Sequence, residues 1–341
     1  MTDSILHSIK PLGFYWDTAD PFIFCVHHND FYPAGNENMG PDPSLLRGRN
    51  IGSDFTVREG WRMYHGDRVP GFPVHPHRGF ETVTLVRNGF VDHSDSIGAA
   101  GRYGNGDVQW MTAGAGIQHC EMFPLLDRDG GNHLELFQIW INLPARNKMV
   151  QPHFSMLWGE TIPEVVHSDN SGRKTTIRII AGSLDGAVAP GPAPDSWAAD
   201  PGNETAIWTI RLEPHARWII PPASAQANRT LYFFRGKSLT VADNPISSGL
   251  SFRTRCDIPV ELTNGDSEGE ILLLQSKPIG EPVIQHGPFV MNTEAEIRQA
   301  FIDYRATAFG GWPWSAYDNV HARDAGRFAL HADGRKETKN Q

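Results

Sequence analysis

The stretch that decides the fold class of this chain is Phe80-Glu81-Thr82-Val83-Thr84-Leu85-Val86. It is rich in β-branched and aromatic residues, which favour strands, and it leads into Asn88-Gly89, a pair preferred in tight β-hairpin turns. A second strand candidate, Phe90–Asp95, follows at once. Short runs of this kind recur about every ten residues from Gly71 to Leu143, between glycine turns, as in sandwiches and barrels. The sequence therefore predicts an all-β fold with a hairpin at Asn88-Gly89.

A second β-rich region begins near Lys174 and extends to Gln275. Because 341 residues exceed what one hydrophobic core usually supports, we expect two domains. The expected division is an N-terminal domain 1–160, a C-terminal domain 161–311 and a C-terminal tail 312–341.

One helix is signalled strongly near the C-terminus. Thr293 and Glu296 form a capping box, with Thr293 as the N-cap. An apolar stripe at helical spacing follows and consists of Ile297, Ala300, Phe301 and Tyr304. We expect this helix to pack on a sheet face and to end at Phe309-Gly310-Gly311, and we expect the polar segment 331–341 to be frayed.

The composition excludes several classes of protein. Lys and Arg number 30 and Asp and Glu 39, a net charge of −9, which argues against direct binding to nucleic acid or to an anionic membrane. No apolar stretch approaches the roughly 20 residues that span a bilayer, and the N-terminus does not resemble a secretory signal. Cys25, Cys120 and Cys256 lie too far apart in sequence for a disulfide framework. We expect a soluble cytoplasmic protein.

Two short motifs could hold a metal ion. His75-Pro76-His77 places two imidazoles on one face of an extended segment, since residues two apart point to the same side. His119-Cys120-Glu121 places an imidazole and a carboxylate on one face in the same way. On neighbouring antiparallel strands, the two motifs would form a cluster of three histidines and one glutamate, a ligand set suited to transition metals with positions left open for substrate.

Other residues compete with this assignment. Glu81 is the main rival to Glu121, but on a straight strand it lies about 13 Å from His77 and could bind only if the chain turned sharply at Gly79. His133-Leu134-Glu135 repeats the His-x-Glu pattern and is expected to face solvent. His27-His28 would point to opposite faces and is expected to be structural. The histidines without a partner at ligand spacing are His7, His65, His93, His153, His167, His215, His286, His321 and His331.

The longer strings around these motifs resemble a known family. The string from His75 to Thr84, HPHRGFETVT, and the string from Gly106 to Met122, GDVQWMTAGAGIQHCEM, resemble the hallmark of the pirins, within the cupin superfamily. Residues 138–144 and 280–293 are similar to pirins as well, so the resemblance extends from roughly Pro21 to Gly311.

The resemblance implies a bicupin, with two jelly-roll β-barrel domains. It implies one divalent transition metal in the N-terminal barrel, held by His75, His77, His119 and Glu121. Iron is the first choice, with Zn, Mn, Ni, Co or Cu as alternatives, and the C-terminal barrel is expected to hold no metal. Pirins often carry Ser or Ala where this chain has Cys120. The stretch 27–67 and the tail after Trp314 look longer than in compact pirins.

Two functions are consistent with the resemblance. Some pirins are similar to quercetinases, metal-dependent dioxygenases that open the flavonol heterocycle with O2, and here Glu121 would act as general base. The substrates would then be a flavonol-like aromatic molecule and dioxygen. Other pirins resemble non-enzymatic, redox-sensing regulators. An acidic chain of that kind would bind a transcription or metabolic protein rather than DNA.

Overall fold

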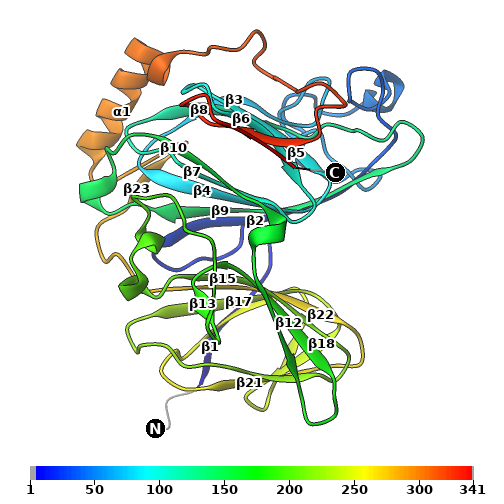
Figure 1. Ribbon diagram of the computed structural model, residues 1–341, viewed down its shortest axis with the longest axis vertical. Coiled ribbons are helices and arrows are strands. Elements are labelled where there is room, and N and C mark those ends of the chain that lie inside the picture. Colours follow the sequence, from blue (N-terminus) through cyan, green and yellow to red (C-terminus); the bar gives the residue numbers. More distant parts are fainter. Residues whose placement is uncertain (1–4, 340–341) are drawn as a thin grey trace. The chain divides into compact units, whose positions relative to one another are not determined.

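The computed structural model describes residues 5–339, and β-strands dominate it (Figure 1). The all-β prediction is therefore confirmed. Among the described residues the single α-helix is α1, Glu294–Thr307, and no helix has the length and apolar character that crossing a bilayer requires. Short 3₁₀ turns lie at Pro43–Leu46, Ala145–Asn147, Gly159–Thr161, Trp197–Ala199, Pro201–Asn203 and Ala308–Gly310.

The chain divides into two compact units that are discontinuous in sequence. Unit 1 contains residues 1–26, 139–142 and 160–280. Unit 2 contains residues 27–138, 143–159 and 281–341. The domains expected from the sequence, 1–160 and 161–311 with a tail 312–341, are continuous, so the two descriptions divide the chain differently.

Unit 2 is built on two antiparallel sheets, although residues 22–26 and 139–142, at the ends of two of their strands, are assigned to unit 1. One has the order β10-β7-β4-β9-β2, with bounds His153–Leu157, Val108–Thr112, Phe80–Asn88, Asn132–Asn142 and Phe22–Tyr32. The other has the order β26-β25-β6-β5-β8-β3, with bounds Lys336–Lys339, Arg327–Leu330, Ala100–Gly104, Phe90–Asp95, Ile117–Met122 and Gly71–His77. Residues from both sheets, among them Val86, Val91 and Phe154, belong to one buried hydrophobic cluster. The alternation of inward and outward side chains along each strand produces this shared core.

The predicted hairpin at Asn88-Gly89 is wrong. The turn does join β4 to β5, and Gly89 has φ 75°. However, β4 pairs with β7 and β9, whereas β5 pairs with β6 and β8, so the chain crosses here from one sheet to the other. The turn signal was real, but the two strands that the turn joins do not pair with each other: β5 pairs with β6, which follows it in sequence, and β4 pairs with the more distant β7 and β9.

The C-terminal segment of unit 2 is ordered. The predicted N-cap is confirmed, since the Glu296 N–H donates to Thr293 Oγ1 at 3.2 Å. Helix α1 packs against Phe289 and Met291 of the two-stranded sheet formed by β23, Ile284–His286, and β24, Phe289–Met291. The expectation of a frayed 331–341 tail is wrong for 331–339, because β26 pairs with β25 and β25 pairs with β6. Residues 340–341 lie outside the described residues.

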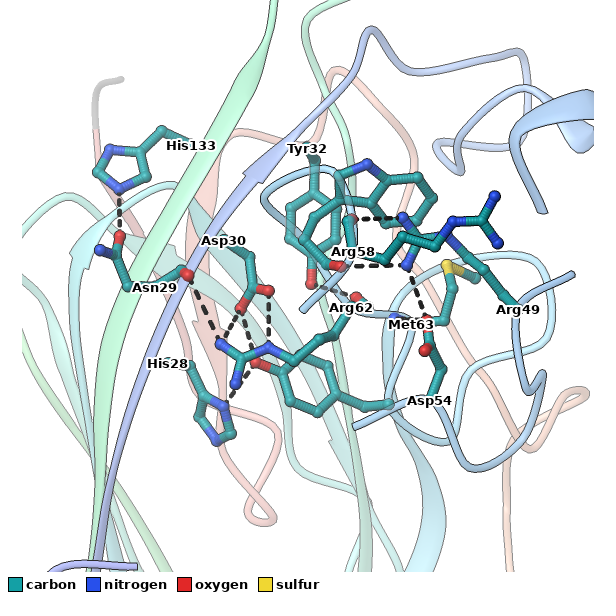
Figure 2. A network of polar contacts seen from close by, with 12 residues as sticks. His28, Asn29, Asp30, Tyr32, Arg49, Asp54, Arg58, Arg62, Met63 and His133 are labelled. Atoms are coloured by element: carbon teal, nitrogen blue, oxygen red, sulfur yellow. Dashed lines mark hydrogen bonds and ion pairs between the residues drawn. The ribbon is translucent and has the colours of Figure 1, made fainter. Parts of the chain in front are cut away.

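The stretch 27–67 contains a buried polar network (Figure 2). The guanidinium of Arg62 donates to both carboxylate oxygens of Asp30, each at 2.9 Å. The Tyr64 hydroxyl donates to Asp30 Oδ2 at 2.6 Å and accepts from His28 Nδ1 at 2.7 Å. A charge-paired network of this kind fixes the path of an otherwise irregular segment.

Unit 1 also contains two antiparallel sheets. The larger has the order β1-β20-β17-β22-β15-β12-β11, with bounds Leu6–Pro11, Leu250–Thr254, Asn228–Arg235, Gly269–Ser276, Ala206–Leu212, Lys174–Ala181 and Glu164–Ser168. The smaller has the order β16-β21-β18-β19, with bounds Arg217–Ile220, Val260–Asn264, Ser238–Val241 and Asn244–Ser247. A short pair, β13 and β14, spans Ser183–Leu184 and Ala187–Val188. The core is formed by apolar side chains from the seven-stranded and the four-stranded sheet, including Trp208, Leu231 and Leu262.

Candidate metal centre

Strands β3 and β8 bring the two histidine motifs together. They pair antiparallel, and His75 lies directly opposite His119. The register shifts between Phe72 and His75, which marks a bulge immediately before the histidine pair. Since bulges re-aim side chains, this irregularity helps to direct His75 and His77 toward the face that carries His119.

The three imidazoles form a tight cluster. One nitrogen from each of His75, His77 and His119 lies within 4.8 Å of the other two. The ring centroids of His75 and His119 are 4.4 Å apart, and that of His77 lies 4.8 Å from His75 and 4.9 Å from His119. His75 Nδ1 donates to the Pro73 carbonyl at 2.9 Å, which leaves Nε2 of that ring with its lone pair available. A second hydrogen bond that fixes the tautomer in this way is usual for a ligating histidine.

The chemistry of this cluster fits a divalent transition metal. His119 is fully buried, and neither ring nitrogen has a hydrogen-bond partner among the described residues. Burial lowers the pKa of His75 to about 4 and lowers the pKa values of His77 and His119 well below the usual range. The three rings are therefore neutral near pH 7, with electron pairs free to bind a cation. A buried polar atom with no partner is costly, and a bound metal would remove that cost.

Glu121 lies beside the cluster but outside its tightest group. Its Oε2 is 3.8 Å from His119 Nε2. The Thr84 hydroxyl donates to Glu121 Oε1 at 2.9 Å, and Gln138 Nε2 donates to Oε2 at 3.3 Å. Burial is the largest influence on this carboxyl group and raises its pKa. The carboxylate is thus held next to the histidines by side chains from β4 and β9.

The rival carboxylate, Glu81, is directed elsewhere. It lies on β4 opposite Thr112, whose hydroxyl donates to Glu81 Oε1 at 2.8 Å. It is fully buried and is not part of the histidine cluster. The chain bends at Gly79, immediately before β4 begins. β4 then pairs with β7, whereas β3, the strand before the bend, pairs with β8.

The expectation that His133-Leu134-Glu135 faces solvent is wrong for the glutamate. Glu135 is fully buried and accepts hydrogen bonds from Arg87 at 2.7 Å and from His27 at 2.9 Å. His133 stacks on Phe31, with ring centroids 4.3 Å apart. β9 lies between β4 and β2 in its sheet, and these neighbours supply the Arg87 and His27 side chains that contact Glu135, which a single-strand pattern assigns to the surface.

Sequence analysis missed one histidine near the cluster. His93, which seemed to have no partner, lies on β5 opposite Glu121, and its ring centroid is 5.4 Å from that of His119. Its Nε2 is 3.0 Å from Asp95 Oδ2, and both side chains are fully buried. The signal was present in the sequence, because His93-Ser94-Asp95 has the same i, i+2 spacing as the other two motifs.

Two family models and several known proteins match this chain. The family model described as Pirin matches residues 51–141, and the model described as Pirin C-terminal cupin domain matches residues 207–310. A Pseudomonas aeruginosa protein named "putative quercetin 2,3-dioxygenase" is 37% identical over 242 residues, 70% of this chain and 79% of that protein. Pirin from Homo sapiens is 34% identical over 264 residues, 71% of this chain and 79% of that protein.

Solved structures show the same architecture. A crystal structure of quercetin 2,3-dioxygenase from Acinetobacter baumannii aligns with a TM-score of 0.69 at 26% identity, covering 90% of this chain and 98% of that one. The predicted two-domain cupin fold is therefore confirmed. With two family models matched and relatives above 30% identity over more than two thirds of its length, the chain belongs to the pirin family.

Proposed function

We propose that this pirin is a metal-dependent dioxygenase of the quercetin 2,3-dioxygenase type. The observation that carries the proposal is the cluster of the half-buried His75 and the buried His77 and His119, with a carboxylate beside it. The names of the Pseudomonas aeruginosa and Acinetobacter baumannii proteins support the same reaction class. In the proposed reaction one O2 is consumed for each flavonol, the heterocycle is opened, and the products are a depside and carbon monoxide.

The proposed metal ligands are His75, His77, His119 and Glu121. The proposed metal is iron, although the same donor set also accepts other divalent transition metals. When bound, the ion would act as a Lewis acid that lowers the pKa of the flavonol hydroxyl.

Glu121 has the properties of a general base for that hydroxyl. Because burial raises its pKa, the carboxylate accepts a proton more readily than an exposed glutamate does near neutral pH. Thr84 and Gln138 hold its two oxygens, so the acceptor is oriented before the substrate arrives. Only 5% of the Glu121 surface is exposed, and this limits competition from bulk water.

The decisive experiment is elemental analysis of the purified protein together with quercetin depletion under oxygen. His119→Ala should strip the metal and abolish flavonol turnover while the far-ultraviolet circular dichroism spectrum stays unchanged. His286→Ala, at an exposed histidine of β23, is the control and should keep both metal and turnover. Unchanged metal content in His119→Ala would show that the ligands are wrong. Stoichiometric metal without any turnover would favour the regulatory alternative instead.

We also propose that the protein is cytoplasmic. Cys25, Cys120 and Cys256 are all free and buried, which suits a reducing compartment. Because the protein has a net charge of −9, we propose that it does not bind nucleic acid directly.

A further inference from the structure

Two residues that adjoin the proposed metal ligands contact the C-terminal segment of unit 2. Arg78 follows His77 immediately after β3, and Gln118 precedes His119 on β8. Because successive side chains of an extended segment point to opposite faces, these two side chains point away from the histidine cluster. Both are buried, and both bind residues of α1 or of the turn that follows it. A single helix is therefore connected to both ligand motifs.

The guanidinium of Arg78 forms a partly buried ion pair with α1. Its Nη1 donates to Asp303 Oδ2 at 2.7 Å, and its Nε donates to the Ala115 carbonyl at 2.7 Å. Its Cζ lies 4.6 Å from the centroid of the Phe309 ring. The hydrogen bond from Arg78 lowers the pKa of Asp303, so the carboxylate is ionised near neutral pH. Because only 6% of the Arg78 side chain is exposed, loss of that carboxylate would leave a buried charge without its partner, which is strongly unfavourable.

The backbone next to His77 is held as well. The Val290 N–H of β24 donates to the Arg78 carbonyl at 3.0 Å. Lys148, which is 1% exposed, donates from Nζ to the carbonyls of Gly79 at 2.8 Å and Val290 at 3.0 Å. The chain that leaves the first ligand motif is thus bound by β24 and by α1.

Gln118 makes three hydrogen bonds to α1 and the turn after it. Its Nε2 donates to the carbonyls of Ala308 at 2.6 Å and Gly311 at 3.1 Å. Its Oε1 accepts from the Tyr304 hydroxyl at 2.9 Å. Both donors and the acceptor oxygen of the amide are therefore occupied, which fixes the orientation of the side chain. The β8 backbone immediately before His119 is fixed with it.

We infer that α1 positions the metal centre, with Asp303 and Tyr304 as positioning residues that act through Arg78 and Gln118. This inference rests on the metal site of the proposed function. Since the three ligand nitrogens come from two strands and lie within 4.8 Å of one another, a small displacement of either strand would separate them. Contacts outside the ligand shell usually orient the ligands, and here they hold the chain on the outer side of each motif.

Cobalt(II) is the probe, because its visible absorption spectrum depends on the geometry of its ligands. The metal-free, full-length protein is titrated with cobalt(II) in competition with a chelator. In Asp303→Ala the dissociation constant should rise about tenfold, the lower end of the usual effect of an outer-shell partner, and the spectrum should change. Asp303→Asn keeps an oxygen acceptor for Arg78 and should restore most of the affinity and the spectrum. Arg298→Ala, at an exposed residue of α1, is the control and should match the unaltered protein.

Tyr304→Phe tests the contact with β8. It keeps the ring against its apolar cluster and removes only the hydroxyl that donates to Gln118. The cobalt affinity should fall by less than in Asp303→Ala, because two carbonyls still bind Gln118. This variant carries the test if Asp303→Ala does not fold.

Urea denaturation of the metal-free variants separates positioning from stability. A lower urea midpoint with an unaltered cobalt dissociation constant and spectrum, in both Asp303→Ala and Tyr304→Phe, would show that α1 is only structural and would overturn the inference. An effect in one variant alone would overturn the assignment of the other residue. Equal cobalt binding by the unaltered protein and by His119→Ala would instead show that the metal site itself, and with it the proposed function, is wrong.

Discussion

At the scale of single residues, the candidate centre depends on burial. The imidazoles of His77 and His119 are taken out of water, so protonation is unfavourable and their lone pairs stay available. Glu121 experiences the opposite effect, because burial of a carboxylate favours its protonated form. The same physical cause thus produces both neutral ligand atoms for a cation and a basic carboxylate 3.8 Å from one of them, His119 Nε2.

Glu121→Gln tests the residue-scale argument. The amide keeps the size of the side chain and can still interact with Thr84, but it cannot accept a proton. We expect flavonol turnover to fall by about 10² to 10⁴, the usual contribution of a general base, while at least part of the metal is retained by the three histidines. Glu59→Gln, at a glutamate whose side chain is 60% exposed, is the control. Turnover at the level of the unaltered protein would contradict the base assignment.

At the scale of elements, pairing of distant strands positions the chemistry. β8 lies between β3 and β5, so it contacts the His75–His77 motif on one side and His93 on the other. The 27–67 segment has little regular structure of its own beyond the end of β2, and buried ion pairs hold it in place (Figure 2). Asp30 is fully buried and receives three hydrogen bonds from Arg62 and Tyr64.

Asp30→Asn is the element-scale prediction. Removing one charge leaves the Arg62 guanidinium buried without its counter-ion, so the free energy of unfolding should fall by about 3–5 kcal/mol. The comparison variant is Lys237→Ala, which breaks an exposed pair with Asp266 and should cost less than about 1 kcal/mol. Urea denaturation followed by tryptophan fluorescence measures both. Equal losses in the two variants would mean that the buried network contributes no more than a surface pair.

At the scale of the whole molecule, the two units have different interiors. Unit 2 contains the three neutral histidines, and unit 1 contains the unpaired Arg229 at the edge of an apolar core. The histidines couple the global stability of the metal-free protein to pH. Their pKa values are lower in the folded state than the roughly 6.5 of an unfolded chain, so the unfolded chain binds more protons in acid.

We therefore expect the free energy of unfolding of the metal-free protein to be highest above about pH 6.5. This free energy should fall progressively as the pH falls toward 4, near the pKa of His75. Each extra proton bound by the unfolded chain contributes a slope of about 1.4 kcal/mol per pH unit. Glu121 acts in the opposite direction but is one group against three. Urea midpoints at pH 7.5, 6 and 5 measure the effect, and His119→Gln should reduce the slope. A pH-independent midpoint in the metal-free protein would refute the buried neutral state.

Much of the architecture followed from the sequence, because its signals are local. β-branched runs predicted the strands, the capping box predicted α1, and the alternation of a strand placed His75 with His77 and His119 with Glu121 on common faces. The pirin strings predicted the two-domain cupin fold that the comparisons confirm. None of these inferences needs knowledge of which strands become neighbours.

Tertiary structure decided the features that depend on strand partners. The pairing of the strands places β4 and β5 in different sheets, so that Asn88-Gly89 connects two sheets. The same pairing buries Glu135 and brings His93 opposite Glu121. It also leaves the Arg229 guanidinium buried with only neutral hydrogen-bond acceptors. The physical reason is that a residue's own sequence neighbours determine which side of a strand it takes, whereas its burial and charge partners come from chain segments far away in sequence.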